Sequence, residues 1–237
     1  MRELLPKVVS RALDVGAGHG LGSYALASGG WEVTALEPDS SSLVGAQSIR
    51  SLAKESGLPI NVVESVGETM PFDDATFDLV FARQVLHHAA DLRGLCGEIM
   101  RVLKPGGTLL AIRDHVISKP EDLEVFLSIH PLHRFYGGEN AYLLKDYIAA
   151  LKSSGLVIDQ VIRPLASPIN FAPYTEETLR KEILGKFPDA FGIRNLFRRA
   201  LAGRRGFRFL LSLASLRDSR PGRLYSFQCH RPSGAAE

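Results

Sequence analysis

Hydrophobic and polar positions in the first half of the chain follow two alternating patterns. Short apolar runs rich in β-branched and aromatic residues are separated by longer segments of helical spacing. Strands are predicted at residues 12–15, 32–37, 60–64, 77–82 and 108–113, and helices near residues 20–29, 40–56 and 91–103. Strands that alternate with helices are typical of βα units around a parallel sheet. The pattern therefore predicts an α/β fold with five parallel strands in this part of the chain.

The rhythm changes after residue 114. A polar and aromatic stretch at 114–138 is followed by a helix predicted near 139–154 and by strands predicted at 156–163 and 224–230. Residues 165–222, between these last two strands, far exceed the roughly two to five residues of a hairpin loop, so we expect them to fold as helices. The whole chain, residues 1–237, is expected to be one domain with a doubly wound, seven-stranded, mostly parallel sheet and a helical cap inserted between the last two strands.

Composition narrows the class of protein. Hydrophobic residues make up 45% and charged residues 23% of the 237 positions, which excludes a collagen, a coiled coil or a mainly disordered chain. No apolar run approaches the roughly 18 residues of a membrane span, and the first residues lack the apolar region of a signal peptide. Two cysteines, Cys96 and Cys229, cannot build a disulfide framework. We therefore expect a cytoplasmic protein whose cysteines are buried thiols.

Charge is distributed unevenly along the chain. Residues 194–223 hold nine arginines and one acid, Asp218, so this segment carries +8 and leaves −6 on the rest of a chain of net charge +2. Such a split suggests an anionic partner. Residues 191–216 mix Phe, Leu and Arg and are a candidate for a basic amphipathic helix that contacts a membrane surface or a phosphorylated acceptor. The alternative is a solvated arginine face that packs on the acidic remainder of the domain.

The segment from Asp14 to Gly20 carries the most specific chemistry. It reads Asp-Val-Gly-Ala-Gly-His-Gly at the end of a predicted strand, and each glycine lets the backbone approach a ligand that a Cβ would exclude. Glu37 closes the second strand about twenty residues later, where a carboxylate accepts hydrogen bonds from both hydroxyls of a ribose. Together these residues predict a nucleoside ligand at the carboxyl edge of the sheet.

Glycine spacing separates two classes of nucleoside ligand. A dinucleotide fingerprint needs glycine at its sixth position, but that position is Leu21 when counted from Gly16 and Ser23 when counted from Gly18. The Asp14 carboxylate would also repel a pyrophosphate, whereas it suits the ammonium and sulfonium groups of S-adenosylmethionine. The motif therefore favours S-adenosylmethionine and argues against a nicotinamide-dependent oxidoreductase.

With these motifs, the sequence resembles the class I S-adenosylmethionine-dependent methyltransferases, in particular their small-molecule type 11 family. The resemblance runs from about residue 11 to residue 114. Its pieces are the glycine segment, Leu36-Glu-Pro-Asp39, Glu68-Thr-Met-Pro-Phe72, Phe77-Asp-Leu-Val80, Leu86-His-His88 and Arg101-Val-Leu-Lys-Pro-Gly-Gly107. It implies a Rossmann-like methyltransferase fold, with 11–114 as the cofactor-binding core, 115–140 as an acceptor-side loop and 165–222 as the cap.

The resemblance also implies which residues bind the cofactor. Gly16, Ala17 and Gly18, with Gly20 completing the turn, would approach the methionine moiety, and Asp14 would lie near its amino group. Glu37 would hold the ribose, Pro38 and Asp39 would lie beside the adenine, Gly67 and Glu68 would border its polar edge, and Arg83 and Gln84 would face the sulfonium end. The family usually has an aspartate at the position of Val66; either Glu68 replaces its contact with the adenine amino group or that contact is lost.

Methyl transfer from a sulfonium is an in-line displacement for which an enzyme mainly supplies proximity, orientation and a desolvated pocket. A general base is needed only where the acceptor loses a proton, and histidine is the natural candidate near neutral pH. We expect such a base at His115, directly after the fifth strand, or at His88, at the end of the fourth. The alternative role of His88 is to fix its loop by hydrogen bonds.

The aromatic stretch 130–140 is a candidate for the acceptor pocket, because loops of this chemistry are often functional. Its candidate residues are His130, His133, Tyr136 and Glu139. Two histidines and an acid also have metal-ligand character, but no pair of them stands at the helical i,i+4 spacing, so the sequence predicts no metal site.

The sequence therefore predicts a methyltransferase that transfers the methyl group of S-adenosylmethionine to a small-molecule or lipid-linked acceptor. A nucleic-acid substrate is disfavoured, because Arg83-Gln-Val-Leu86 stands where an Asn-Pro-Pro-Tyr-like motif would follow the fourth strand. The alternative is a non-catalytic S-adenosylmethionine-binding or regulatory module of the same fold. Val66 favours this alternative, whereas the glycine segment and Glu37 oppose it.

Overall fold

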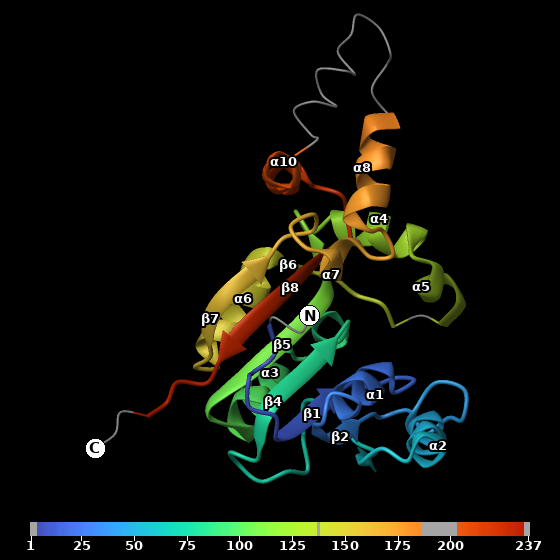
Figure 1. The fold of residues 1–237 in the computed structure, drawn as a ribbon, viewed down its shortest axis with the longest axis vertical. Helices are drawn as coiled ribbons and strands as arrows, with labels where there is room; N and C mark the ends of the chain where they lie inside the picture. The colour runs from blue at the N-terminus through green and yellow to red at the C-terminus, as the bar shows by residue number, and fades with distance from the viewer. Residues whose placement is uncertain (1–3, 137, 186–202, 235–237) are drawn as a thin grey trace, which may run out of the picture.

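The computed structural model describes residues 4–136, 138–185 and 203–234. These residues form one sheet with helices on both sides (Figure 1). The strands are β1 (Arg11–Val15), β2 (Glu32–Leu36), β3 (Ile60–Val63), β4 (Phe77–Arg83), β5 (Leu103–Ile117), β6 (Tyr142–Leu143), β7 (Val157–Ile162) and β8 (Arg223–His230). Their order in the sheet is β3-β2-β1-β4-β5-β8-β7, with β6 beside β5, and β8 is antiparallel to both of its neighbours. The predicted mostly parallel α/β sheet is confirmed.

Helices cover both faces of the sheet, as a doubly wound fold requires. In the core they are α1 (Leu21–Ala27), α2 (Ala46–Ser56), α3 (Leu92–Val102) and α6 (Leu144–Ser153), and a short 3-10 helix, η2 (Leu86–His88), follows β4. Along β4, Leu79 and Phe81 pack in the apolar cluster of α1, whereas Val80 and Ala82 pack in the cluster of α3 and α6. Successive side chains of a strand point to opposite faces, so each of the two faces has its own core.

The stretch predicted to be irregular, residues 114–138, contains two helices, α4 (Asp122–Ile129) and α5 (Pro131–Tyr136). The carboxylate of Asp122 accepts hydrogen bonds from the backbone N–H groups of Ser118 and Lys119, which turns the chain from β5 into α4. Phe126 then packs against Ile117 and Ala141 in a small buried cluster. Tertiary contacts, which a local pattern does not report, therefore stabilise α4, and the expected acceptor-side loop is largely helical.

Two predicted helix boundaries also differ from the structure. The helix expected near residue 40 begins at Ala46, because the Asp39 carboxylate accepts a hydrogen bond from the N–H of Ser41 and forms a turn there. The helix expected from residue 139 begins at Leu144, after the two residues of β6 pair with Val116 and Ile117. β6 is the eighth strand, and it is too short to give a recognisable pattern in the sequence.

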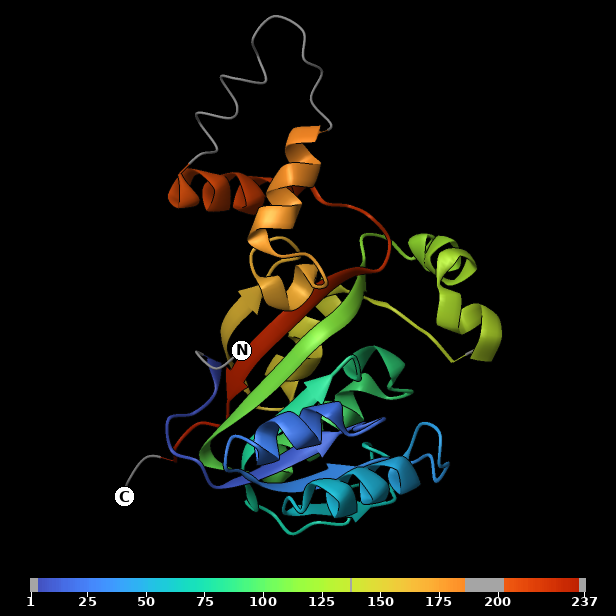
Figure 2. The same ribbon diagram turned by 45° about the vertical axis from the view of Figure 1, so that its right-hand side comes forward.

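The segment between β7 and β8 folds as helices, as predicted: α7 (Pro168–Phe171), α8 (Glu176–Gly185) and α10 (Arg204–Arg217). Phe171, Leu179, Phe207 and Leu211 form an apolar cluster of their own. α8 and α10 lie at the end of the molecule opposite α1 and α2 (Figures 1 and 2). The first part of the amphipathic helix predicted over 191–216 falls outside the described residues. Within the described ranges, none of the helices is long and apolar enough to cross a membrane.

A buried carboxylate joins the ends of β4 and β5. Asp114 is fully buried, and its Oδ1 accepts hydrogen bonds from the backbone N–H groups of Val85 and His87, both at 3.2 Å, and from Nδ1 of His87 at 3.0 Å. The pairing of β5 with β8 shifts between Ala111 and Asp114, so a bulge in β5 precedes this carboxylate. The chain that follows β4 is therefore held by a side chain from the neighbouring strand.

Replacement of Asp114 by alanine is expected to lower the free energy of unfolding by about 3–5 kcal/mol, because three buried donors lose their acceptor. Urea unfolding followed by far-UV circular dichroism measures the loss. Asp159→Ala is the matched control: this aspartate pairs with His230 at the surface, and its removal is expected to cost less than about 1 kcal/mol. Equal losses in the two variants would contradict the structural role assigned to Asp114.

Candidate functional site

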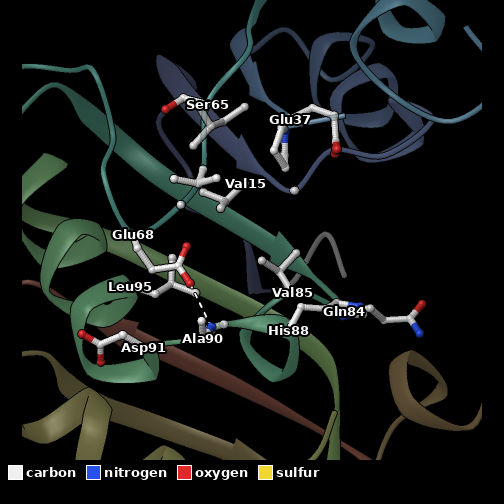
Figure 3. A pocket seen from close by; sticks show the side chains of 16 residues that line it. Val15, Glu37, Ser65, Glu68, Gln84, Val85, His88, Ala90, Asp91 and Leu95 are labelled. Carbon is white, nitrogen blue, oxygen red and sulfur yellow. Dashed lines mark hydrogen bonds between the residues drawn. The ribbon is translucent and has the colours of Figure 1, made fainter. Parts of the chain in front are cut away.

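A cavity of about 840 Å³ lies at the carboxyl ends of β1, β2 and β4, where the strand order reverses (Figure 3). In doubly wound sheets ligands bind at this switch point. The residues that line the cavity are Val15, Gly16, Leu36, Glu37, Pro38, Ser65, Val66, Gly67, Glu68, Gln84, Val85, His88, Ala89, Ala90, Asp91 and Leu95.

The glycine segment forms one wall of this site. Gly16, Gly18 and Gly20 have φ angles of 59°, 54° and 78°, the left-handed region that favours glycine. A Cβ on Gly16 would lie 2.8 Å from Cγ2 of Val85, so the backbone of the loop approaches η2 as closely as glycine allows. Beside Gly18, in contrast, a Cβ would meet no atom within 4 Å. The loop therefore leaves open space for a ligand next to its backbone.

Glu37 ties the end of β2 to the glycine segment. Its carboxylate is buried and accepts hydrogen bonds from the N–H of Gly18 at 2.7 Å and the N–H of Asp39 at 3.0 Å. Each carboxylate oxygen keeps a further lone pair, and the side chain lines the cavity (Figure 3). The group is therefore able to accept hydrogen bonds from two neighbouring hydroxyls of a ligand.

Asp14 lies at the other end of the glycine segment. It is buried, and the hydroxyl of Ser23 donates a hydrogen bond of 2.6 Å to its carboxylate. Burial raises the pKa of Asp14 to about 7, against the lowering effect of the Ser23 hydrogen bond. With Gly16, Ala17, Gly18 and Arg83 it lines a smaller cavity of about 140 Å³. A buried carboxyl of this kind is suited to face a cation.

The other predicted cofactor residues divide into two groups. Pro38, Gly67, Glu68 and Gln84 line the large cavity, where the carboxylate of Glu68 accepts a hydrogen bond of 3.0 Å from the N–H of Ala90 (Figure 3). The lining of the large cavity does not include Asp39, Gly20 or Arg83. The carboxylate of Asp39 accepts a hydrogen bond from the hydroxyl of Ser41, and Gly20 packs against Ile49. Arg83 lines the small cavity. Val66 lines the large cavity without offering a polar side chain. The individual ligand contacts stay predictions.

A cluster of histidines lies next to this cavity. His87 is buried, with its Nδ1 bonded to Asp114 and its Nε2 3.5 Å from Oε2 of Glu139. Burial alone would lower the pKa of His87, but the Asp114 and Glu139 carboxylates raise it above the usual value. Neither His87 nor Asp114 is among the site residues predicted from the sequence. The signals for them are the segment Leu86-His-His88 and an acid directly after a strand.

Both candidate bases have one ring nitrogen bound to a backbone carbonyl. His88 donates from Nδ1 to the carbonyl oxygen of Gly138 at 3.0 Å, and His115 donates from Nδ1 to that of Gly222 at 2.8 Å. Burial, together with the neighbouring His87, lowers the pKa of His88, and burial lowers the pKa of His115 to about 4. His88 lines the large cavity and His115 does not. The contact of His88 with Gly138 is a hydrogen bond of the loop-fixing kind. The role of His88, and a role as base for either histidine, stay predictions.

The predicted acceptor residues are brought together only in part. Glu139 is buried among the histidines, with Oε1 3.8 Å from Nδ1 of His130. His133 instead lines a separate cavity beside α4. The side chain of Tyr136 lies outside the described part of the structure.

Comparison with known proteins agrees with this site. A family model described as a methyltransferase domain matches residues 13–111. Over 104 residues the chain is 38% identical to the ubiquinone biosynthesis O-methyltransferase of Methylocella silvestris, an alignment that covers 43% of this chain and 38% of that relative. The chain thus spans well under two thirds of the length of this relative.

Two solved structures share the fold. The YcgJ protein of Bacillus subtilis superposes with a TM-score of 0.63 at 20% identity, covering 98% of this chain and 96% of that one. A geranyl diphosphate methyltransferase in complex with S-adenosylmethionine superposes with a TM-score of 0.64 at 18% identity, covering 97% of this chain and 82% of that one. At this level of identity the two structures show a shared fold. The family model places residues 13–111 in a methyltransferase domain of the class I, S-adenosylmethionine-dependent type 11 family.

Proposed function

We propose that this protein transfers the methyl group of S-adenosylmethionine to a small-molecule acceptor by in-line displacement. The observation that carries the proposal is the Glu37 carboxylate, held by the N–H groups of Gly18 and Asp39 while it lines a cavity of about 840 Å³. The open space beside Gly18 fits a ligand that approaches the loop backbone. A cavity of this volume at a sheet switch point is typical of a nucleoside cofactor site.

When bound, S-adenosylmethionine supplies a methyl group on an activated leaving group, so the chain has to bind, orient and exclude water. Glu37 would accept hydrogen bonds from the ribose hydroxyls. The backbone of residues 16–18 and the Asp14 carboxyl would hold the methionine end, and Glu68 would border the adenine. The alternative, a non-catalytic module, is favoured by the apolar Val66 in the cavity, but the complete cradle around Glu37 favours catalysis.

Acceptor chemistry is suggested by relatives and by the second large cavity. The relatives include a ubiquinone biosynthesis O-methyltransferase and a geranyl diphosphate methyltransferase, whose names point to small or lipid-like acceptors. In this chain, a cavity of about 980 Å³ at the insertion is lined by apolar residues, by Arg217, Arg220 and Arg223, and by the acids Glu182 and Asp218. Arg220 pairs with Asp218, so Arg217 and Arg223 are the arginines that would face an anionic group. We therefore propose an apolar acceptor with an anionic group, in keeping with a lipid-linked substrate.

We also propose that α10 contacts a membrane surface. Phe209, Leu213 and Leu216 are exposed on this helix, opposite the buried Phe207 and Leu211. An apolar face flanked by arginines is typical of a helix that lies in the membrane interface. The ion pair of Arg208 with Glu176 supports the alternative of an arginine face that packs on the domain. A cytoplasmic location is part of the same proposal, supported by the buried, unpaired Cys96 and Cys229.

Calorimetric titration tests the cofactor. S-adenosylmethionine and S-adenosylhomocysteine are expected to bind at micromolar affinity, and Glu37→Ala to weaken both by about 10–100-fold through the loss of charge-assisted hydrogen bonds. Glu55→Ala, an exposed acid on α2, is the control and should bind as the parent does. NADH is expected not to bind. Failure of both sulfur nucleosides to bind the parent would overturn the proposed function.

The affinity for S-adenosylhomocysteine is expected to depend on pH through Asp14. With its pKa raised to about 7 by burial, the free chain holds a proton there at lower pH, and a cofactor ammonium favours the ionised form. Binding therefore releases this proton, so affinity should rise about tenfold per pH unit from about pH 5 to 7 and then level off. Calorimetry in buffers of different ionisation enthalpy counts the protons. Asp14→Asn should remove the release and Glu55→Gln should keep it; identical release in both would refute the assignment.

Sedimentation with lipid vesicles tests the membrane contact. The chain is expected to co-sediment with vesicles that contain anionic phosphatidylserine, and the double variant Phe209→Ser, Leu213→Ser to lose this binding several-fold because two apolar anchors are removed. Val125→Ser removes an exposed apolar side chain from α4 instead, and should have little effect. Unchanged sedimentation of the double variant would speak for the solvated arginine face.

A further inference from the structure

Two buried histidine nitrogens without hydrogen-bond partners lie beside a buried carboxylate in the histidine cluster. They are Nε2 of His115 and Nδ1 of His130, and the carboxylate is that of Glu139, whose Oε2 also makes no hydrogen bond but lies 3.5 Å from Nε2 of His87. The ligand atoms of His115, His130 and Glu139 lie within 4.8 Å of one another. A buried polar group without a hydrogen bond destabilises a fold, so such atoms grouped at one point indicate a binding site rather than ordinary packing.

The tautomer of His115 is fixed by its surroundings. A carbonyl oxygen only accepts hydrogen bonds, so the 2.8 Å contact with Gly222 requires that Nδ1 carries the proton. Nε2 then carries the lone pair, and it is one of the two buried nitrogens without a hydrogen bond. A histidine that donates one ring N–H to a carbonyl and presents the other nitrogen is the usual arrangement of a metal ligand.

Glu139 provides the negative charge of the cluster. Its side chain is only 7% exposed, and its oxygens lie 3.5 Å from Nε2 of His87 and 3.8 Å from Nδ1 of His130. Two ligands bound to one ion at about 2.1 Å with tetrahedral geometry are about 3.4 Å apart. The separation between Glu139 and His130 is therefore close to that of two ligands of one ion.

We propose that His115, His130 and Glu139 bind one divalent transition-metal ion, with Zn²⁺ as the preferred species. Two imidazoles and a carboxylate suit Zn²⁺, whereas Mg²⁺ and Ca²⁺ prefer sites made of oxygen. The ring of Phe126 packs against both histidines, at 4.8 and 5.0 Å between centroids, and gives the site an apolar wall. This proposal does not depend on methyl transfer.

A second set, His87, His88 and Glu139, shares the carboxylate. The first set is favoured because its members leave buried atoms unpaired, whereas the side chain of His88 is 43% exposed. The three chosen ligands come from β5, from the end of α4 and from the chain after α5, so one ion would join this helical segment to the sheet. Three protein ligands also leave a coordination position free for water or a further ligand.

The test uses a chain without affinity-tag histidines, stripped of metal by dialysis against a chelator. Zn²⁺ is expected to bind with a stoichiometry of one ion per chain. Co²⁺ in the same site is expected to give the visible ligand-field absorption of a four- or five-coordinate ion. His115→Ala, His130→Ala and Glu139→Gln should each weaken binding by more than about 100-fold, since the loss of an outer partner alone costs 10–100-fold. Far-UV circular dichroism and urea unfolding of each variant report that its fold is intact.

Two control variants make the assignment specific. His230→Ala removes a surface histidine that pairs with Asp159 on β7, and it should leave Zn²⁺ affinity unchanged. His88→Ala should also keep tight binding if the ion lies on the proposed set. Loss of binding in His88→Ala but not in His115→Ala would move the ion to the second set and overturn the proposal, as would the absence of any stoichiometric binding. Because these titrations need no cofactor, a failure of the methyltransferase proposal would be seen separately.

Discussion

The Asp114 carboxylate holds in place the segment that follows β4, which borders both the cofactor cavity and the histidine cluster. It binds two backbone N–H groups and one ring of the segment after β4, and that segment has only the short helix η2 as regular structure of its own. Val85, one of the residues so held, is also the side chain against which Gly16 packs. The wall of the cofactor cavity and the orientation of His87 thus depend on the hydrogen bonds of one buried carboxylate. Surroundings of low polarity strengthen these hydrogen bonds and also raise the cost of leaving the carboxylate unpaired.

The cofactor side could be predicted because its determinants are local in sequence. The glycine segment, Glu37 and the strands that carry them lie within about thirty residues, and the parallel pairing of Val15 with Leu36 brings the ends of β1 and β2 together. The left-handed backbone angles at Gly16 and Gly18 are ones that glycine adopts without steric cost. Short apolar runs likewise predicted the buried strands, because a strand covered on both faces is apolar along most of its length.

The acceptor side could not be predicted in the same detail, because its contacts join distant parts of the chain. Asp114 binds the segment after β4, and Glu139 lies close to His87 and His130. Phe126 stabilises α4 through contacts that no helical pattern reports. Helical i,i+4 spacing also does not mark the proposed metal ligands, because they stand at residues 115, 130 and 139. The histidines were visible as candidates in the sequence, but their grouping is a property of the fold.

The contact between Glu37 and Gly18 has a consequence for the binding of a nucleoside. Because the carboxylate ties the glycine segment through the N–H of Gly18, this segment loses less conformational entropy on binding than a loop without such a contact would. In the proposed methyltransferase, the exchange of used for fresh cofactor would then depend on the contacts that break at the ribose and at the methionine end.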